Sequence, residues 1–312
     1  MEGKMLYSGK DLRKLIIPLI IEQILAIAVG MADTIMVSAA GEAAVSGVSL
    51  VDTVNILLIN VFSALATGGA VVSGHFLGKK KREDACKSAW QILLFATLLA
   101  FVISVIFITA HDPLLRLMFG KIEDDVMKAS KTYLIITTYS FVALAIYNSC
   151  AALFRAMNES KVTMWVSLLM NVINVVGNAI CIYGLHMGVA GVAIPTTISR
   201  YVAAVVIFLL MFQTKKEINL CGQITWKFNG SLIKKILYIA IPNGLENSMF
   251  QLGKILVMSA VATMGTSAIA ANAVTGTIAN WNNLPGFAIN LAIVSVVSVC
   301  VGAGKYLSLI HI

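Results

Sequence analysis

The chain has 312 residues, of which 59% are hydrophobic and only 12% are charged, and its mean hydropathy is +0.88. A soluble domain carries about 25% charged residues, so the composition excludes an ordinary soluble protein and predicts a membrane protein. The net charge of +8 does not indicate nucleic acid binding, because the basic residues lie in short tracts between apolar segments, as membrane-orientation signals do.

Eight apolar segments are long enough to cross a bilayer, which takes roughly 20 residues each. In chain order they cover residues 15–40, 45–77, 89–110, 132–154, 162–183, 189–212, 236–264 and 269–301. Between the third and the fourth lies an amphipathic segment, 111–131, which we expect at the membrane interface. The five cysteines show no metal-binding spacing and are predicted to be reduced packing residues.

The basic residues orient these segments in the membrane. With the N-terminus inside, the inner connections carry seventeen Lys and Arg residues and the outer connections carry four. Lys and Arg accumulate on the cytoplasmic side of membrane proteins. We therefore predict a multi-pass protein of the cell membrane with a cytoplasmic N-terminus.

The second part of the chain repeats the first at an offset of 224 residues. Pro18 matches Pro242, Glu22 matches Glu246 and Gly78 matches Gly302, without a gap. Six segments separate the two copies, so both start on the same side and the repeat is parallel, with its axis along the membrane normal.

The repeat predicts the domain organisation. We expect an N-terminal bundle of six helices over 1–213, a cytoplasmic linker over 214–235 and a partial second bundle of two helices over 236–305. The last residues, 306–312, end in LSLIHI and are interpreted as a non-native tail on a truncated reading frame, with a genuine short C-terminus as the alternative.

Five stretches taken together resemble the multidrug and toxic compound extrusion (MATE) family, over residues 10–305. They are GMADTIMV (30–37), FLGKKK (76–81), NVINVVGN (171–178), GVAGVAIPT (188–196) and IPNGLENSMFQLGKIL (241–256). The resemblance implies an all-α polytopic fold with two six-helix bundles arranged in a V. It also implies antiport of organic, often cationic, compounds against Na⁺ or H⁺. This chain would contain the first bundle and the first two helices of the second.

Asp33 is the strongest candidate for a functional residue, since an ionisable group in the bilayer costs at least about 2.5–3.5 kcal/mol. Glu22 lies eleven residues earlier, close to three helical turns, so both side chains point to the same side. A carboxylate at this depth can exchange a proton or ligate Na⁺. The resemblance gives an aspartate here the key ion-coupling role. A purely structural hydrogen bond is the alternative.

Three asparagines, Asn171, Asn174 and Asn178, form a polar stripe on the fifth segment. Amide oxygens suit a hard cation such as Na⁺. The resemblance places an Asn, and an Asp four residues later, beside the first-segment Asp. Here that pair is Asn174 and Asn178, so the second carboxylate is missing, which weakens the expectation of tight Na⁺ binding and leaves proton coupling through Asp33 open. Helix–helix hydrogen bonding is the alternative.

Thr196 follows a proline on the sixth segment, and Pro195 frees a backbone carbonyl in the previous turn. The resemblance puts the matching Thr, and the carbonyl at the position of Val192, at the ion site. Arg200 lies one turn further on and needs a partner in the membrane, for which Asp33 or a loop carboxylate are candidates.

The seventh segment carries Glu246 and Lys254, two helical turns apart. We expect them to line a substrate cavity or gate together with Glu22, Asn171 and Arg200. For Glu246 the alternative is a position near the inner membrane interface.

Pro18 and Pro242 lie early in equivalent segments and are predicted to let the helices bend. The resemblance links bending of the first helix to protonation of its aspartate. The hypothesis is that a proton on Asp33 changes the contacts of Asn174 and Thr196, shifts the bend at Pro18 and expels the substrate.

The leading functional hypothesis is a monomeric antiporter that exports small organic drugs or metabolites in exchange for H⁺ or Na⁺. It uses no cofactor, works in the lipid bilayer and binds no nucleic acid. A flippase for lipid-linked precursors or polysaccharides from the same superfamily is the alternative. It would need a more basic central cavity, and the small number of intramembrane cations, Arg200 and Lys254, argues against it. An enzyme or a receptor is a further alternative, but no catalytic cluster or metal motif supports an enzyme.

Overall fold

The computed structural model describes residues 6–119, 123–221, 226–262 and 266–306, without the side chains of 118, 119, 252, 254–256, 258–262, 266–274, 276 and 277. All regular structure in these residues is helical. In chain order the helices are α1 (Gly9–Ser38), α2 (Glu42–Gly78), α3 (Arg82–Thr109), α4 (His111–Phe119), α5 (Asp124–Thr138), α6 (Phe141–Ala156), α7 (Ser160–Ala179) with the π turn η1 (Ile180–Gly184), α8 (Ala190–Leu210), α9 (Gly230–Ala262) and α10 (Thr266–Gly302).

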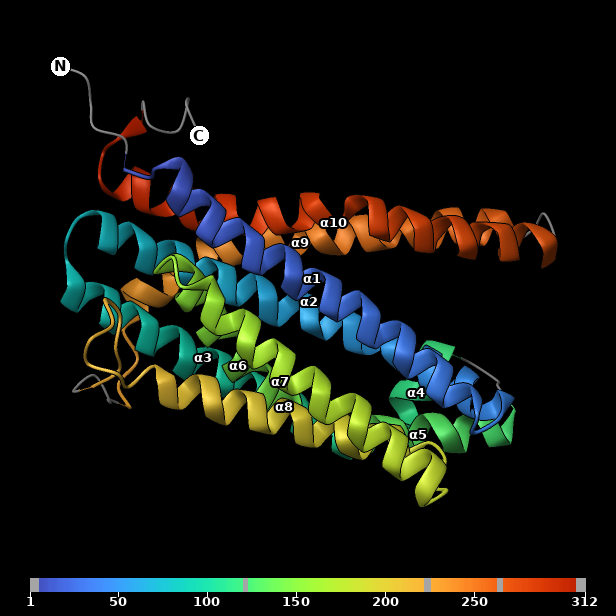
Figure 1. Cartoon of the computed structure of the whole chain (residues 1–312). Coiled ribbons are helices and arrows are strands. Elements are labelled where there is room, and N and C mark those ends of the chain that lie inside the picture. The colour runs from blue at the N-terminus through green and yellow to red at the C-terminus, as the bar shows by residue number, and fades with distance from the viewer. Residues whose placement is uncertain (1–5, 120–122, 222–225, 263–265, 307–312) are drawn as a thin grey trace.

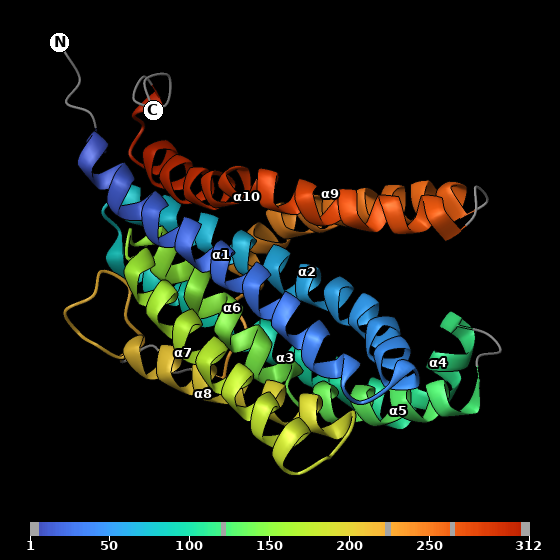
Figure 2. The same ribbon diagram turned by 45° about the vertical axis from the view of Figure 1, so that its right-hand side comes forward.

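Six helical stretches in the described residues are long and apolar enough to cross a bilayer, and α5 with α6 makes a seventh. The predicted segment 236–264 falls on α9, which runs beside α10 in both views (Figures 1 and 2). Residues 263 and 264 of that segment lie outside the described residues. The prediction of an all-helical, multi-pass membrane protein is confirmed.

The fourth predicted segment, 132–154, is not one straight helix, because α5 and α6 meet at an angle of 51°. The Thr and Ser hydroxyls of the run TTYS, 137–140, donate to backbone carbonyls one turn earlier and so compete with the helical bonds. Helix α8 covers the break: the Thr197 hydroxyl donates to the carbonyl of Ile136 (3.0 Å) and the Tyr201 hydroxyl to that of Tyr139 (2.8 Å). A break at membrane depth is tolerated where protein groups satisfy the freed backbone.

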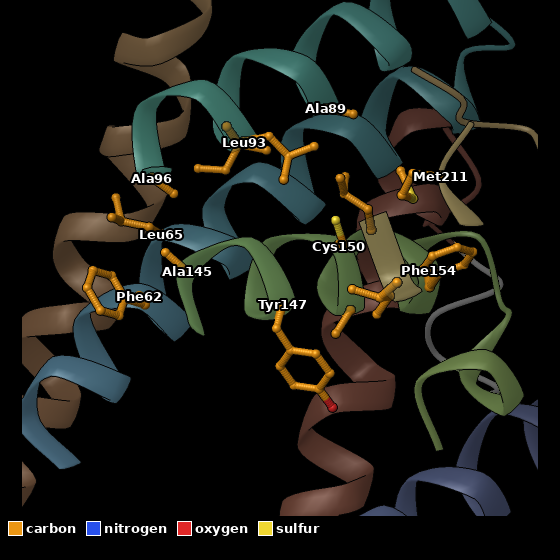
Figure 3. Packing of buried hydrophobic residues seen from close by; sticks show 14 of the residues in the cluster. Phe62, Leu65, Ala89, Leu93, Ala96, Ala145, Tyr147, Cys150, Phe154 and Met211 are labelled. Atoms are coloured by element: carbon orange, nitrogen blue, oxygen red, sulfur yellow. The ribbon is translucent and has the colours of Figure 1, made fainter. Parts of the chain in front are cut away.

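The main apolar core joins α2, α3 and α6, and α8 closes it (Figure 3). Phe62 and Phe154 are among its largest fully buried side chains, and the many alanines between them let the helices approach closely. Ile218 and Leu220 are also fully buried in this core. The predicted linker, 214–235, therefore packs on the first bundle over part of its length instead of only connecting two bundles.

Helices α9 and α10 meet the rest of the molecule at the end where α2 stops, and they diverge from it toward the other end (Figures 1 and 2). Two glycines make the contact. A Cβ on Gly78 would collide with the carbonyl oxygen of Val299, and a Cβ on Gly302 would collide with the carbonyl oxygen of His75. Residues 75 and 78 become 299 and 302 at the repeat offset of 224, so the two contacts are equivalent, as in an interface around a two-fold axis.

A third glycine marks that axis. A Cβ on Gly74 would collide with the hydroxyl oxygen of Ser298, and these two residues are themselves equivalent at the offset of 224. Equivalent residues meet each other only on a symmetry axis. In Figure 1, α1 and α9 run in one direction and α2 and α10 in the other, which agrees with the parallel repeat.

This contact predicts that one methyl group at Gly302 weakens the protein. Since the added Cβ meets a backbone carbonyl, Gly302→Ala should lower the free energy of unfolding by about 1–3 kcal/mol, the usual cost of overpacking. Thermal unfolding of the purified chain in detergent measures the loss. Gly286→Ala on the same helix is the matched control, because a Cβ there meets no atom within 4 Å. Equal stability of the two variants would contradict the predicted interface.

Candidate ion-coupling site

A continuous hydrogen-bonded chain links α1, α7 and α8. The Asn178 amide nitrogen donates to Asp33 Oδ1 at 2.7 Å and to Asn174 Oδ1 at 3.2 Å. The Asn174 amide nitrogen donates to Thr196 Oγ1 at 2.9 Å, and the Thr196 hydroxyl donates to the carbonyl of Val192 at 2.8 Å. The structure therefore brings together all four residues predicted to couple ion movement.

Local sequence explains this arrangement. Asn174 and Asn178 are one helical turn apart on α7 and face the same neighbours. Pro195 stands inside α8, where its missing N–H leaves a backbone carbonyl of the preceding turn without its helical bond. The hydroxyl of Thr196 bonds in that same turn, to Val192. Both asparagines and Thr196 are buried, whereas Asp33, at one end of this series of hydrogen bonds, is only half-buried.

Two amides of the stripe keep unused hydrogen-bonding capacity. Among the described residues, Asn178 Oδ1 and Asn171 Nδ2 have no hydrogen-bond partner although both side chains are buried. A buried polar atom without a partner costs about 1–3 kcal/mol, so the packing of the helices alone does not account for them. Asn178 Oδ1 is the more informative of the two, because it belongs to the amide that contacts Asp33.

A second carboxylate, which the sequence analysis missed, faces this region from α2. Asp52 Oδ1 accepts hydrogen bonds from the Tyr133 hydroxyl at 3.1 Å and from the Asn55 amide at 3.3 Å. Asp52 interacts electrostatically with Asp33. The sequence did contain a signal for Asp52, because it is an ionisable residue inside the second apolar segment, 45–77. Such a residue is a candidate for a functional role.

Arg200 supplies the positive charge between these acids. It interacts electrostatically with both Asp33 and Asp52, and its Nη1 donates to the Ser140 hydroxyl at 2.8 Å. Ser140 occupies the break between α5 and α6, so the bend of the fourth segment positions the acceptor for this guanidinium. Asp52, which was not among the candidates, thus adds with Asp33 to the negative charge around Arg200, whose hydrogen-bond partner is Ser140.

Glu22 lies in a separate cluster on the same side of α1, eleven residues before Asp33. Thr163 Oγ1 donates to Glu22 Oε2 at 2.9 Å, and Arg155 Nη1 lies 3.4 Å from Glu22 Oε1. The two charged side chains are nearly buried, at 12% exposure for Arg155 and 11% for Glu22. This cluster joins α1 to α6 and α7, so Glu22 is held by partners and does not line an open cavity in this conformation.

The remaining predicted residues lie apart from the ion site. Glu246 and Pro242 are exposed on α9, and the side chain of Lys254 lies outside the described residues. Pro18 is buried within α1, which continues unbroken through it from Gly9 to Ser38. Over the part of the chain that the structure describes, no three His, Cys, Asp or Glu side chains gather as a metal site would require.

Comparison with known proteins places this geometry in a family context. The MatE family model matches residues 18–180, more than half of the chain. The "Uncharacterized transporter YisQ" of Bacillus subtilis is 28% identical over 88% of this chain, and the "Probable multidrug resistance protein NorM" of Thermotoga maritima is 25% identical over 95%. The chain spans only 60% and 64% of the length of these two proteins.

A solved structure shares the fold. An outward-facing multidrug resistance MATE family transporter of the MOP superfamily superposes with a TM-score of 0.89 at 22% sequence identity. The match covers 97% of this chain and 67% of that protein.

The Asp52 and Arg200 charges are predicted to depend on each other for stability. Removing either partner leaves the other charge less compensated in a dry environment. We expect Asp52→Asn and Arg200→Met each to destabilise the chain, and the double variant to lose less than the sum of the two, by about 0.5–3 kcal/mol of coupling. Thermal unfolding of the four proteins in detergent measures it. Lys161→Met, an exposed charge on α7, should combine additively with Asp52→Asn; additivity of Arg200→Met as well would disprove the coupling.

Proposed function

The chain belongs to the MatE family of membrane transporters and is not an enzyme, and from this premise we propose that it works as an H⁺-coupled antiporter that exports organic compounds. Members of the family couple transport to H⁺ or Na⁺. Because the chain covers less than two thirds of the length of its relatives, transport activity, substrate class and coupling ion are all part of this proposal.

The observation that carries the proposal is the pairing of Asp33 with the Asn178 amide. The Asn178 Nδ2 donates to the carboxylate, which is the arrangement of an ionised Asp33, while Asn178 Oδ1 has no partner among the described residues. An amide is a donor on one side and an acceptor on the other. This pair can therefore respond to a proton on Asp33 by rotation of one side chain.

The proposed step follows from donor and acceptor counting. A proton on Asp33 turns the carboxylate into a donor, which the Asn178 amide can accept only if it presents Oδ1. Turning the amide withdraws Nδ2 from Asn174 Oδ1, since the same nitrogen makes both bonds. Asn174 then changes its contact with Thr196, and protonation at α1 reaches α8.

The same geometry favours H⁺ over Na⁺. The Asn178 Nδ2 lies between Asp33 Oδ1 and Asn174 Oδ1, at 2.7 and 3.2 Å, where a cation shared by these oxygens would otherwise bind. Replacing the amide by a second carboxylate would add a charge and remove the donor, and charged oxygens are what hard cations prefer.

The charges near the site support an organic cation as substrate more than a lipid-linked anionic precursor. Two half-buried acids, Asp33 and Asp52, share one cation, Arg200. An acidic site of this kind attracts positive ligands. The flippase alternative requires a basic central cavity, whereas the charges around Asp33 in this bundle are acidic on balance, so it remains the second candidate.

Movement of α1 is the proposed output of the site. Glu22 holds this helix to α6 and α7 through Arg155 and Thr163, and Pro18 lies one turn before it. A bend at Pro18 would therefore move α1 against a fixed point at Glu22. We further propose that the N-terminus is cytoplasmic and that the protein acts as a monomer in the cell membrane.

Asp33→Asn is predicted to abolish efflux driven by a pH gradient, because an amide cannot take up the coupling proton. Ethidium efflux from energised cells that express the chain, measured with and without an imposed pH gradient, provides the test. The matched control is Asp112→Asn, which removes an acid that pairs with Lys131 on the surface and should leave efflux intact. Full activity of Asp33→Asn beside an active control would overturn the proposal.

Asn178→Asp is predicted to introduce Na⁺ binding. The second carboxylate replaces the donor between Asp33 and Asn174, so Na⁺ should stabilise this variant against thermal unfolding. A ligand at 100 times its Kd adds about 2.7 kcal/mol, and K⁺ at equal ionic strength controls for screening. The unmodified chain should respond equally to Na⁺ and K⁺. A specific Na⁺ response of the unmodified chain would favour Na⁺ as the coupling ion instead.

A further inference from the structure

A cavity of about 560 Å³ opens between α2 and α9, at the end of the molecule where α2 stops. Val72 and Phe76 of α2 and Ile239 of α9 form its apolar wall. The same two helices bring three lysines to it, Lys79 directly after α2 and Lys234 and Lys235 on α9. An apolar wall beside a group of like charges is unusual for a simple packing defect, because such defects are lined by apolar side chains.

The positive charge of this cavity is not balanced by neighbouring acids. No Asp or Glu lines it, and the described ion pairs do not include any of the three lysines. Lys235 Nζ lies 5.9 Å from the centre of the Phe76 ring. Lys234 and Lys235 also stand near the start of α9, where the helix dipole is positive and disfavours cations. The three exposed lysines therefore present positive charge at the cavity that no described acid compensates.

The repeat supplies an internal comparison. At the offset of 224, Lys235 corresponds to Asp11 and Lys79 to Ala303, while Lys234 corresponds to Lys10 and Tyr238 to Lys14. The equivalent position between α1 and α10 therefore has two lysines and an acid in place of three lysines. Ser231, at the cavity, corresponds to Tyr7, which packs against the apolar cluster of α1 and α10. The α2–α9 side thus differs from its equivalent in having no acid among its lysines and a small residue, Ser231, where the other side has Tyr7.

The ends of the helices indicate that the cavity lies at the depth of lipid headgroups. Helix α2, which is long and apolar enough to cross a membrane, ends at Gly78, and Lys79 follows directly. Tyr238 is 82% exposed beside the cavity, as aromatic residues are at the membrane interface. Basic pockets between membrane helices at this level bind the phosphate groups of lipids.

We propose that this cavity binds one anionic phospholipid. The three lysines hold the headgroup phosphate, and an acyl chain lies along the apolar wall of Val72, Phe76 and Ile239. Since the cavity is formed by α2 and α9 together, the lipid bridges the two parts of the molecule at the end where they meet. Bound lipid should therefore strengthen their contact.

Lipid binding to the purified, delipidated chain tests this proposal. Phosphatidylglycerol and phosphatidylcholine are titrated separately, and bound lipid is counted by native mass spectrometry. We expect a preference for phosphatidylglycerol that Lys234→Gln with Lys235→Gln reduces about 30-fold, or about fivefold for each lysine. The matched control is Lys10→Gln with Lys14→Gln, which removes two charges at the equivalent end of α1 and should keep the preference. Equal loss in both double variants would show general surface attraction and overturn the site.

A second variant blocks the cavity without changing its charge. Ser231→Tyr copies the residue at the equivalent position and should exclude the lipid while all lysines remain. Unchanged phosphatidylglycerol binding in this variant, with a normal unfolding temperature, would also refute the site. Glycerol 1-phosphate serves as the soluble headgroup: if it competes at the concentration at which the whole lipid binds, the cavity is a site for free phosphate esters and not for a lipid.

Discussion

Polar groups inside a bilayer must find their partners within the protein, and this constraint accounts for most of the internal structure of the chain. It fixes the bend between α5 and α6, where hydroxyls of α8 cover the exposed carbonyls. It also fixes the pairing of Glu22 with Arg155 and Thr163. In both places the polar contact joins neighbouring helices, so satisfying the backbone and the charges also sets how the helices pack.

The ion site is the place where this constraint is only partly met. The amide nitrogens of Asn174 and Asn178 both donate hydrogen bonds, yet Asn178 Oδ1 has no partner among the described residues. The second copy of the repeat has Val257 at the position equivalent to Asp33, so the carboxylate at this position is confined to the first copy. A symmetric scaffold thus supports an asymmetric site. Helix α1 carries the titratable Asp33, and α7 and α8 contact it through the hydrogen bonds of Asn178, Asn174 and Thr196.

Sequence patterns predicted those features that depend on spacing along one helix. The stripe of Asn174 and Asn178, and the common side of Glu22 and Asp33, follow from helical periodicity, and the membrane-crossing segments follow from hydropathy. The role of Asp52 did not, because its partner Tyr133 comes from a helix 81 residues away and no local pattern links the two. The bend in the fourth segment was also missed, since hydroxyls that bond to their own helix leave the hydropathy of the segment unchanged.

The contact between Gly74 and Ser298 has a consequence for the ancestry of the repeat. In a precursor made of two identical copies, this residue would have faced itself, so any side chain would have been added twice at the same point. A small residue on both sides was then obligatory. In one chain with two diverged copies, a change on one side of the axis is not repeated on the other, so the side chain of Ser298 can lie opposite Gly74. A mutation at the axis of this chain therefore alters only one side of the contact.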